Sequence, residues 1–380
     1  MITTDAWVLH AGPIGATTPP GELARETIRI PPQNDDEALV EPLYGSWEAN
    51  MTHAIQRSPV DVCRQRGETS VVLGNSGVVR VLRPAKHYPS LSEGDLCLVM
   101  CTSQRDPHGY VERILAYDAP ATFGLLATRT KIKSDQLLPL PPATKYPLPR
   151  WAPTLRYFTA WDNWQVAHGC WRTQMRHEDP ADHLVFGYGG GAALAELILA
   201  RHAGFRVAMT ISTKRRAKVV EQHGITPVPR PVCSATDSGQ ADPSHDQLRC
   251  SERTFLDTVN ALSNGLGVAI FLDNIGGPLH STTLRSLARQ GVLSTFGWKA
   301  GMKLTQVRAS ECITRHLHVH THAWRHHDAH RIRDYQEDTG WLADIDPAAV
   351  YNFDDVPHLA KKYANGEEGA YFPLYRVNPL

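Results

Sequence analysis

The pattern of apolar and polar residues divides the chain into two regions. Through about residue 145, short apolar runs alternate with glycine, proline and aspartate, a pattern typical of β-strands joined by turns. Residues 137–153 are rich in proline and cannot form a regular helix, so they indicate a boundary. From Trp151 onwards, large apolar residues recur at helical spacing. The pattern therefore predicts a β domain over residues 1–150 and a domain of another kind after it.

The second region alternates strand-like and helix-like segments. This alternation predicts a doubly wound parallel sheet over residues 151–320, and a tail over 321–380 with short helices and one extended piece. A polar segment at 231–252 predicts a surface insertion. The predicted strands are 183–188, 205–211, 268–275 and 291–298, and the predicted helices are 192–204, 214–224, 255–267 and 279–291. Trp161, Trp164 and Trp171 fall on one face of an earlier helix, where we expect core packing.

Composition narrows the class of function. The chain has 380 residues, and its 39 basic and 39 acidic residues give a formal net charge of zero, which argues against a broad surface for nucleic acid or an anionic membrane. We find no basic segment followed by an apolar core at the start, and no apolar run as long as a spanning helix. The seven cysteines form no C-x-x-C pair and are odd in number, which is typical of reduced thiols. We therefore expect a cytoplasmic protein that acts on a small molecule.

Four glycines lie between the first predicted strand of the second region and the helix after it. They are Gly187, Gly189, Gly190 and Gly191, and Ala193 takes the last small-residue place. This is the context of the dinucleotide-binding turn, in which missing side chains and the N–H groups of a helix N-terminus admit a pyrophosphate. The alternative is a tight structural turn.

The end of the next predicted strand lacks the acidic residue that usually binds the ribose of NAD. Ser212 stands there instead, followed by Lys214, Arg215 and Arg216. A hydroxyl and three cations would bind a 2′-phosphate, whereas a carboxylate would repel it. The alternative is a solvated basic start of a helix. The pattern predicts NADPH rather than NADH.

Short motifs resemble those of the medium-chain dehydrogenase/reductase superfamily. They are EALVEPLYGSWEANMTHAI at 37–55, LSEGDLCLVM at 91–100, YFTAWDNW at 157–164 and LDNIGG at 272–277. The resemblance implies a GroES-like β domain (1–150), a Rossmann domain that binds NADPH (151–320) and a C-terminal segment returning to the first domain (321–380). It also implies a homodimer, with Thr159, Asn274 and Phe296 as further cofactor contacts.

The resemblance is to a zinc-free branch of that superfamily. Glu48 stands where zinc-dependent members have a cysteine, Gly74-Asn75-Ser76 replaces their Gly-His-Glu, and the four-cysteine zinc lobe is absent, so we expect no metal. Gly74-Asn75 resembles 2-enoyl thioester reductases, and residues 116–141 and 319–335 resemble crotonyl-CoA carboxylase/reductases. The Asn-Tyr-Asn segment of the carboxylating enzymes is not cleanly present, which leaves carboxylation in doubt.

This resemblance implies a reductase that transfers hydride to an α,β-unsaturated thioester, bound to CoA or a carrier, or to an enone, in a specialised biosynthetic pathway. The candidate catalytic residues are Tyr44, Glu48, Asn50, His53 and His322, each of which could instead be a polar wall residue. A quinone or alcohol/carbonyl oxidoreductase of the same fold is an alternative. A cofactor-binding protein without hydride chemistry is another.

Histidines crowd the segment from His316 to His330. His316, His318, His320 and His322 alternate, so they would share one face if the segment is a strand. A polar strand face, a metal site and a pocket for an anionic substrate tail remain open interpretations.

Overall fold

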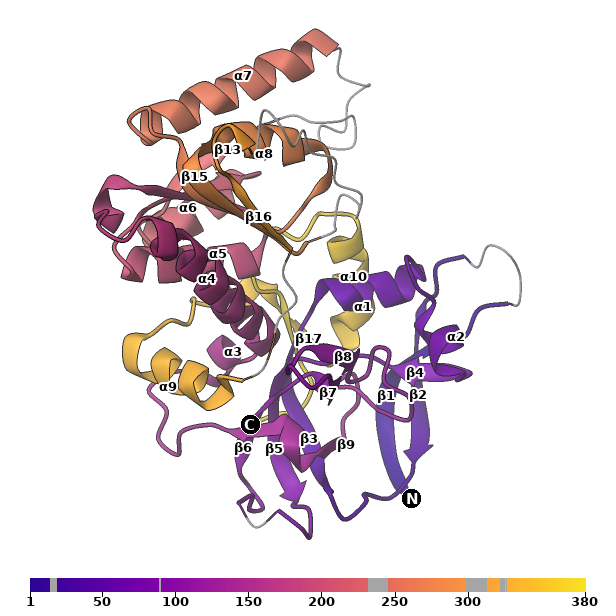
Figure 1. Ribbon diagram of the computed structural model, residues 1–380. Helices are drawn as coiled ribbons and strands as arrows, with labels where there is room; N and C mark the ends of the chain where they lie inside the picture. Colours follow the sequence, from indigo (N-terminus) through magenta and orange to yellow (C-terminus); the bar gives the residue numbers. More distant parts are fainter. Residues whose placement is uncertain (14–18, 89, 232–244, 298–312, 322–324, 326) are drawn as a thin grey trace. The chain divides into compact units, whose positions relative to one another are not determined.

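The chain consists of two compact units, each with β-sheet structure of its own. The computed structural model describes every residue except 14–18, 89, 232–244, 298–312, 322–324 and 326 (Figure 1). Unit 1 comprises Met1–Phe158 and Arg325–Leu380, and unit 2 comprises Thr159–Trp324. The boundaries predicted from the sequence fall after residues 150 and 320, close to these divisions.

Unit 1 is rich in β-strands, as the short apolar runs predicted, and its strands pair antiparallel except for β17 and β18, which are parallel. Its main sheet has the order β10-β6-β5-β3-β18-β17, with β9 also paired to β3, and a second sheet has the order β2-β1-β4. The strands β7 and β8 form a separate hairpin. The strands are β1 (Ile2–His10), β2 (Leu23–Ile30), β3 (Glu37–Ser46), β4 (Ser70–Val72), β5 (Gly77–Arg83), β6 (Leu96–Val99), β7 (Thr102–Arg105), β8 (Val111–Ile114), β9 (Thr130–Lys133), β10 (Leu137–Pro139), β17 (Val350–Asn352) and β18 (Leu374–Arg376).

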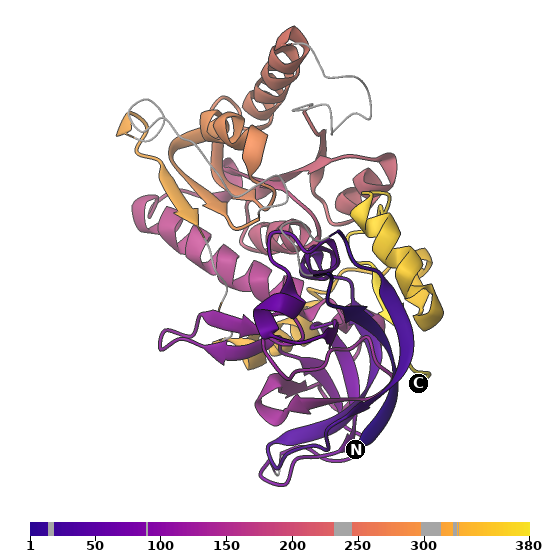
Figure 2. The same cartoon turned by 90° about the vertical axis from the view of Figure 1, so that its right-hand side faces the viewer.

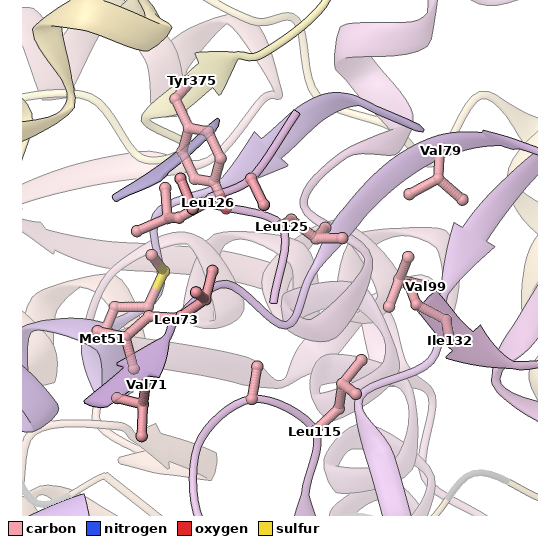
Figure 3. Close-up of a cluster of buried hydrophobic side chains, with 14 of the residues drawn as sticks. Met51, Val71, Leu73, Val79, Val99, Leu115, Leu125, Leu126, Ile132 and Tyr375 are labelled. Atoms are coloured by element: carbon pink, nitrogen blue, oxygen red, sulfur yellow. The ribbon is translucent and has the colours of Figure 1, made fainter. Parts of the chain in front are cut away.

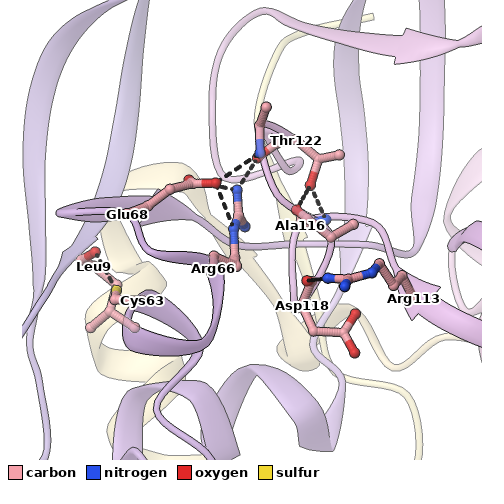
Figure 4. Close-up of polar contacts among 10 residues, drawn as sticks. Leu9, Cys63, Arg66, Glu68, Arg113, Ala116, Asp118 and Thr122 are labelled. Atoms are coloured by element: carbon pink, nitrogen blue, oxygen red, sulfur yellow. Dashed lines mark hydrogen bonds and ion pairs between the residues drawn. The ribbon is translucent and has the colours of Figure 1, made fainter.

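The helices of unit 1 are mostly short. One of the loops between its elements is held by Arg66, which binds the carboxylate of Glu68 with two nitrogens, at 3.1 and 2.8 Å, and the Thr122 carbonyl at 2.8 Å (Figure 4). The helices are α1 (Ala49–Gln56), α2 (Val62–Arg66), α3 (Leu148–Trp151), α9 (Ala329–Thr339) and α10 (Val356–Ala364), and α4 (Thr154–Gln174) begins in unit 1 and continues into unit 2. Single 3₁₀ turns lie at Ser134–Gln136, Pro347–Ala349 and Phe353–Asp355.

The core of unit 1 includes a side chain from near the end of the chain. Tyr375 on β18 is fully buried among residues such as Met51, Leu73 and Leu126 (Figure 3). β18 pairs with β3 so that Tyr375 lies opposite Gly45. A Cβ on Gly45 would lie 2.1 Å from Cζ of the Tyr375 ring, so only glycine leaves room for the ring.

Unit 2 has the predicted doubly wound parallel sheet, with helices between its strands (Figures 1 and 2). The strand order is β13-β12-β11-β14-β15-β16, and every pair is parallel. The order reverses between β11 and β14, and open sheets of this kind bind ligands at the carboxyl ends of the strands there. The elements are β11 (Leu184–Tyr188), α5 (Gly191–His202), β12 (Arg206–Ile211), α6 (Lys214–Gln222), β13 (Thr226–Pro229), α7 (His245–Leu262), β14 (Val268–Asp273), α8 (His280–Ser286), β15 (Leu287–Thr295) and β16 (His318–Thr321), with 3₁₀ turns at Pro180–Asp182 and Gly277–Leu279.

Several predicted elements of unit 2 have other bounds in the structure: the helix predicted at 255–267 spans His245–Leu262, and the strand predicted at 291–298 spans Leu287–Thr295. The helix predicted to Gly291 ends at Ser286, because the Arg315 guanidinium binds the carbonyls of Leu284 (2.6 Å) and Leu287 (2.8 Å) at its C-terminus. The predicted insertion at 231–252 is helical from His245 on, and its residues 232–244 lie outside the described residues.

The histidine segment is a strand only in part. β16 contains His318 and His320, whereas His316 has a left-handed backbone with φ 56° and precedes the strand. His322 lies outside the described residues. The expected burial of Trp161, Trp164 and Trp171 is confirmed. Of the helices the structure describes, none is long and apolar enough to cross a membrane.

Gly45→Ala tests the packing of Tyr375. We expect the overlap with the ring to lower the free energy of unfolding by about 1–3 kcal/mol. Gly169→Ala in α4 is the control, because its Cβ would meet nothing within 4 Å and alanine is favoured in helices by about 0.5–1 kcal/mol. Thermal unfolding of both variants measures the difference, and an unchanged Tm for Gly45→Ala would contradict this account of the core.

Candidate functional site

The glycine turn joins β11 to α5 at the carboxyl edge of the parallel sheet. A Cβ on Gly189 would lie 2.9 Å from Cβ of Asn274 and 3.0 Å from Cβ of Ala193, so the turn tolerates no side chain there. A Cβ on Gly187 would lie 2.6 Å from Cδ1 of Leu197, so the absence of a side chain at Gly187 lets α5 pack on the strand. Gly190 instead faces open space and precedes the first residue of α5, Gly191. The N–H groups at the start of α5 are therefore not covered by a side chain at position 190, which suits a pyrophosphate.

The segment after β12 is basic and contains no acid. Ser212, Lys214 and Arg215 are exposed, and Arg216 is half-buried. The Thr213 side chain caps α6 by accepting a hydrogen bond from the Arg216 N–H at 3.2 Å. A hydroxyl and three cations at the start of a helix can bind a phosphate that a carboxylate would repel.

Two of the three further cofactor candidates lie at the same edge of the sheet as the glycine turn. Asn274 directly follows β14, and its N–H donates to the Tyr188 carbonyl at 2.8 Å. Phe296 follows β15 and is half-buried, and a Cβ on its neighbour Gly297 would overlap the Asn274 carbonyl. Thr159, the third candidate, is buried on α4.

A buried carboxyl group lies behind the glycine turn. Glu196 of α5 is fully buried, and its Oε1 accepts a hydrogen bond from Asn163 Nδ2 at 2.5 Å. Its Oε2 accepts from Asn274 Nδ2 at 3.3 Å. Asn163 Oδ1 in turn accepts from the Ser294 hydroxyl. Burial raises the pKa of Glu196 to about 8, and the two amide donors only partly oppose that effect.

The candidates from the first region, Tyr44, Glu48, Asn50 and His53, lie along β3 and α1 of unit 1. Tyr44 is buried on β3, and Asn50 and His53 are half-buried on α1. Burial lowers the pKa of His53, which favours the neutral imidazole near pH 7. Within the described part of the chain, the buried Asn50 Oδ1 accepts no hydrogen bond.

Glu48 is engaged in a buried ion pair. Its Oε2 accepts from Arg156 Nε at 2.9 Å, and the same guanidinium donates to the Trp47 carbonyl at 2.6 Å and to the Tyr371 carbonyl. Glu48 therefore has Arg156 as its ion-pair partner. The same contacts fix the segment that precedes α1 to the first turn of α4. His322, the fifth candidate, lies outside the described residues.

Sequence reasoning missed the residues that support these sites. A signal for Glu196 was present, because it is the only acid within the apolar stretch AALAELILA at 192–200. Arg156 and Asn163 gave no such signal, since their partners lie far away in the sequence.

His318 contacts Gln174, with 2.5 Å between the two Nε2 atoms. Among the described residues, no group of three or more metal-binding side chains comes together.

Comparison with known proteins identifies the fold. No protein-family model and no curated protein sequence matches the chain. Among solved structures, crotonyl-CoA carboxylase/reductase AntE in complex with NADP is similar at 15% identity, with 99% of this chain and 95% of that chain covered and a TM-score of 0.78. The 2-octenoyl-CoA carboxylase reductase CinF, in complex with NADP and 2-octenoyl-CoA, shares 16% identity over 99% of this chain and 88% of that chain, with a TM-score of 0.77.

An alcohol dehydrogenase from Aeropyrum pernix is similar as well, at 16% identity over 98% of this chain and 100% of that chain, with a TM-score of 0.74. These similarities confirm the predicted fold, that of the medium-chain dehydrogenases and reductases, with a GroES-like and a Rossmann domain.

The ion pair between Glu48 and Arg156 can be tested by a double-mutant cycle. Arg156→Met leaves the Glu48 charge buried without its cation, so we expect it to lower the free energy of unfolding by roughly 3–5 kcal/mol. Adding Glu48→Gln should restore part of that loss, because no unpaired charge then remains. Chemical denaturation of the two single variants and the double variant measures the coupling. Simple addition of the two single effects would show that the pair does not interact.

Glu196 should make the stability of the protein depend on pH. The carboxyl keeps its proton up to about pH 8 in the folded state but loses it near its ordinary value of 4.5 once unfolded. The free energy of unfolding should therefore fall as pH rises through that window, by up to roughly 1.4 kcal/mol per pH unit. Glu196→Gln cannot titrate, and its curve of unfolding free energy against pH should lack this decline. Parallel curves for the two proteins would refute the assignment.

Proposed function

We propose that this chain is an NADPH-dependent reductase that transfers hydride to an α,β-unsaturated thioester, bound to CoA or a carrier, or to an enone. The proposal depends on one observation in unit 2. A glycine turn at the start of α5 is combined with a basic segment without acid after β12. This combination suits a dinucleotide with a 2′-phosphate.

The residues of unit 2 fit such a cofactor. The turn at Gly189–Gly191 and the start of α5 would hold the pyrophosphate. Ser212 with the basic residues Lys214, Arg215 and Arg216 would hold the 2′-phosphate. Thr159, Asn274 and Phe296 are assigned to the remainder of the cofactor.

When bound, NADPH supplies the hydride that reduces the β-carbon of the substrate. The enolate that results needs hydrogen-bond donors at its oxygen and a proton at its α-carbon. We assign the donor role to the Tyr44 hydroxyl, the Asn50 amide and the N–H of a neutral His53, and we keep His322 as a candidate proton donor. Because Glu48 is paired with Arg156, we assign it the positioning of the segment before α1.

The thioester is preferred as substrate because the reductases named above act on, or are bound to, acyl-CoA compounds. The similarity to an alcohol dehydrogenase keeps alcohol and carbonyl substrates as the second candidate. A zinc-free reaction, a homodimer, a cytoplasmic location and a specialised pathway belong to the same proposal.

Charge reversal at Arg216 tests the cofactor. Arg216→Glu should weaken NADPH binding by about tenfold or more and change NADH binding little, because only NADPH carries the 2′-phosphate. Arg289→Glu is the control, since Arg289 is exposed near the N-terminal end of β15, away from the glycine turn. Nicotinamide fluorescence measures binding, and turnover with enoyl-CoA, enone, quinone and alcohol substrates separates the candidate reactions. NADPH binding without turnover of any acceptor would favour a cofactor-binding protein, and no binding of either cofactor would exclude the reductase.

A further inference from the structure

Glu196 lies among buried apolar residues, where burial of a carboxyl group is energetically unfavourable. Its neighbours in α5, from Ala193 to Ala200, are all buried, and so is Glu196 itself. α5 packs against β11, β12 and β14, whose described side chains are largely apolar. Burying a polar group in such surroundings is unfavourable unless its hydrogen bonds are made. The position therefore calls for an explanation beyond packing.

The hydrogen bonds of Glu196 join four elements of unit 2. One carboxyl oxygen binds Asn163 of α4, and the other binds Asn274 in the turn after β14. Asn163 continues the network to Ser294 of β15. All of these contacts lie within unit 2, and Glu196, Asn163 and Ser294 are fully buried.

The Asn274 end of this network forms a wall of the glycine turn. Asn274 Cβ is the nearest atom to the place where Gly189 would carry a side chain, and the Asn274 N–H binds the Tyr188 carbonyl at 2.8 Å. A shift of Asn274 would therefore alter the space beside Gly189. Glu196, in the helix that follows the glycines, holds the Asn274 side chain by accepting a hydrogen bond from Asn274 Nδ2 at 3.3 Å.

We propose that Glu196 is a positioning residue that holds Asn274 against the glycine turn through the Asn163–Glu196–Asn274 hydrogen bonds, and so sets the affinity of the turn for NADPH. This inference rests on the proposed function. It makes the carboxyl a part of the cofactor site that never contacts the cofactor. An amide can replace the carboxyl in this role, because its oxygen can accept from Asn163 while its NH2 group donates to Asn274 Oδ1 once the Asn274 amide is turned; among the described residues that oxygen otherwise accepts no hydrogen bond. A thioether of similar size can do neither.

The test compares Glu196→Gln with Glu196→Met, alone and combined with Asn274→Ala. We expect Glu196→Gln to bind NADPH within about threefold of the wild type, and Glu196→Met to bind it about tenfold more weakly, the equivalent of one lost hydrogen bond. In the Asn274→Ala background, Glu196→Met should cause little further loss, because the two residues act through one contact. Ser263→Ala is the control: Ser263 is equally buried, but it binds the Gly267 N–H at the other end of β14.

Two results would overturn the inference. One is a Glu196→Met protein that binds NADPH as tightly as Glu196→Gln. The other is a double variant whose loss is the full product of the two single losses.

Amide hydrogen exchange at Asn274 distinguishes failure of the positioning role from failure of the proposed function. If the wild type binds no NADPH, the proposed function is wrong, and exchange then decides the positioning role alone. Faster exchange in Glu196→Met but not in Ser263→Ala supports that role, and equal exchange in both variants refutes it.

Discussion

Close approach of backbone segments at the carboxyl edge of the parallel sheet is the constraint on which unit 2 depends. Neither Gly189 nor Gly297 could carry a side chain without meeting Asn274. Three turns, after β11, β14 and β15, therefore pack closely, with Asn274 Cβ against Gly189 and the Asn274 carbonyl against Gly297. The start of α5, the basic segment after β12 and the Glu196 network all take their positions from strands that end at this edge.

Unit 1, like unit 2, contains a buried acidic side chain. There Glu48 is also buried, but its partner is the Arg156 cation rather than a pair of amides. A carboxylate with a guanidinium keeps its charge at a large desolvation cost, whereas a carboxyl among neutral amides avoids that cost by keeping its proton. Burial of Glu48 is thus compensated by an opposite charge, whereas burial of Glu196 is compensated by hydrogen bonds to neutral amides.

Much of the fold could be predicted from the sequence because its signals are local. The alternation of apolar runs with helical segments predicts the parallel sheet, and the glycines between β11 and α5 predict the turn. The end of α8 could not be predicted in this way, because Arg315, some thirty residues later, binds its last carbonyls. The candidate site was likewise predictable only in part. The glycines and the basic triplet are local signals in the sequence, whereas the partners of Glu48 and Glu196 are set by tertiary contacts. The roles of the individual site residues remain predictions.

The place of β18 in the main sheet of unit 1 has a consequence for synthesis of the chain. β18 pairs between β3 and β17, and it follows unit 2 in the sequence. The core around Gly45 can therefore close only after all residues of unit 2 have been made. Domains generally fold as units during synthesis. Unit 2 can thus fold while unit 1 still lacks β17 and β18.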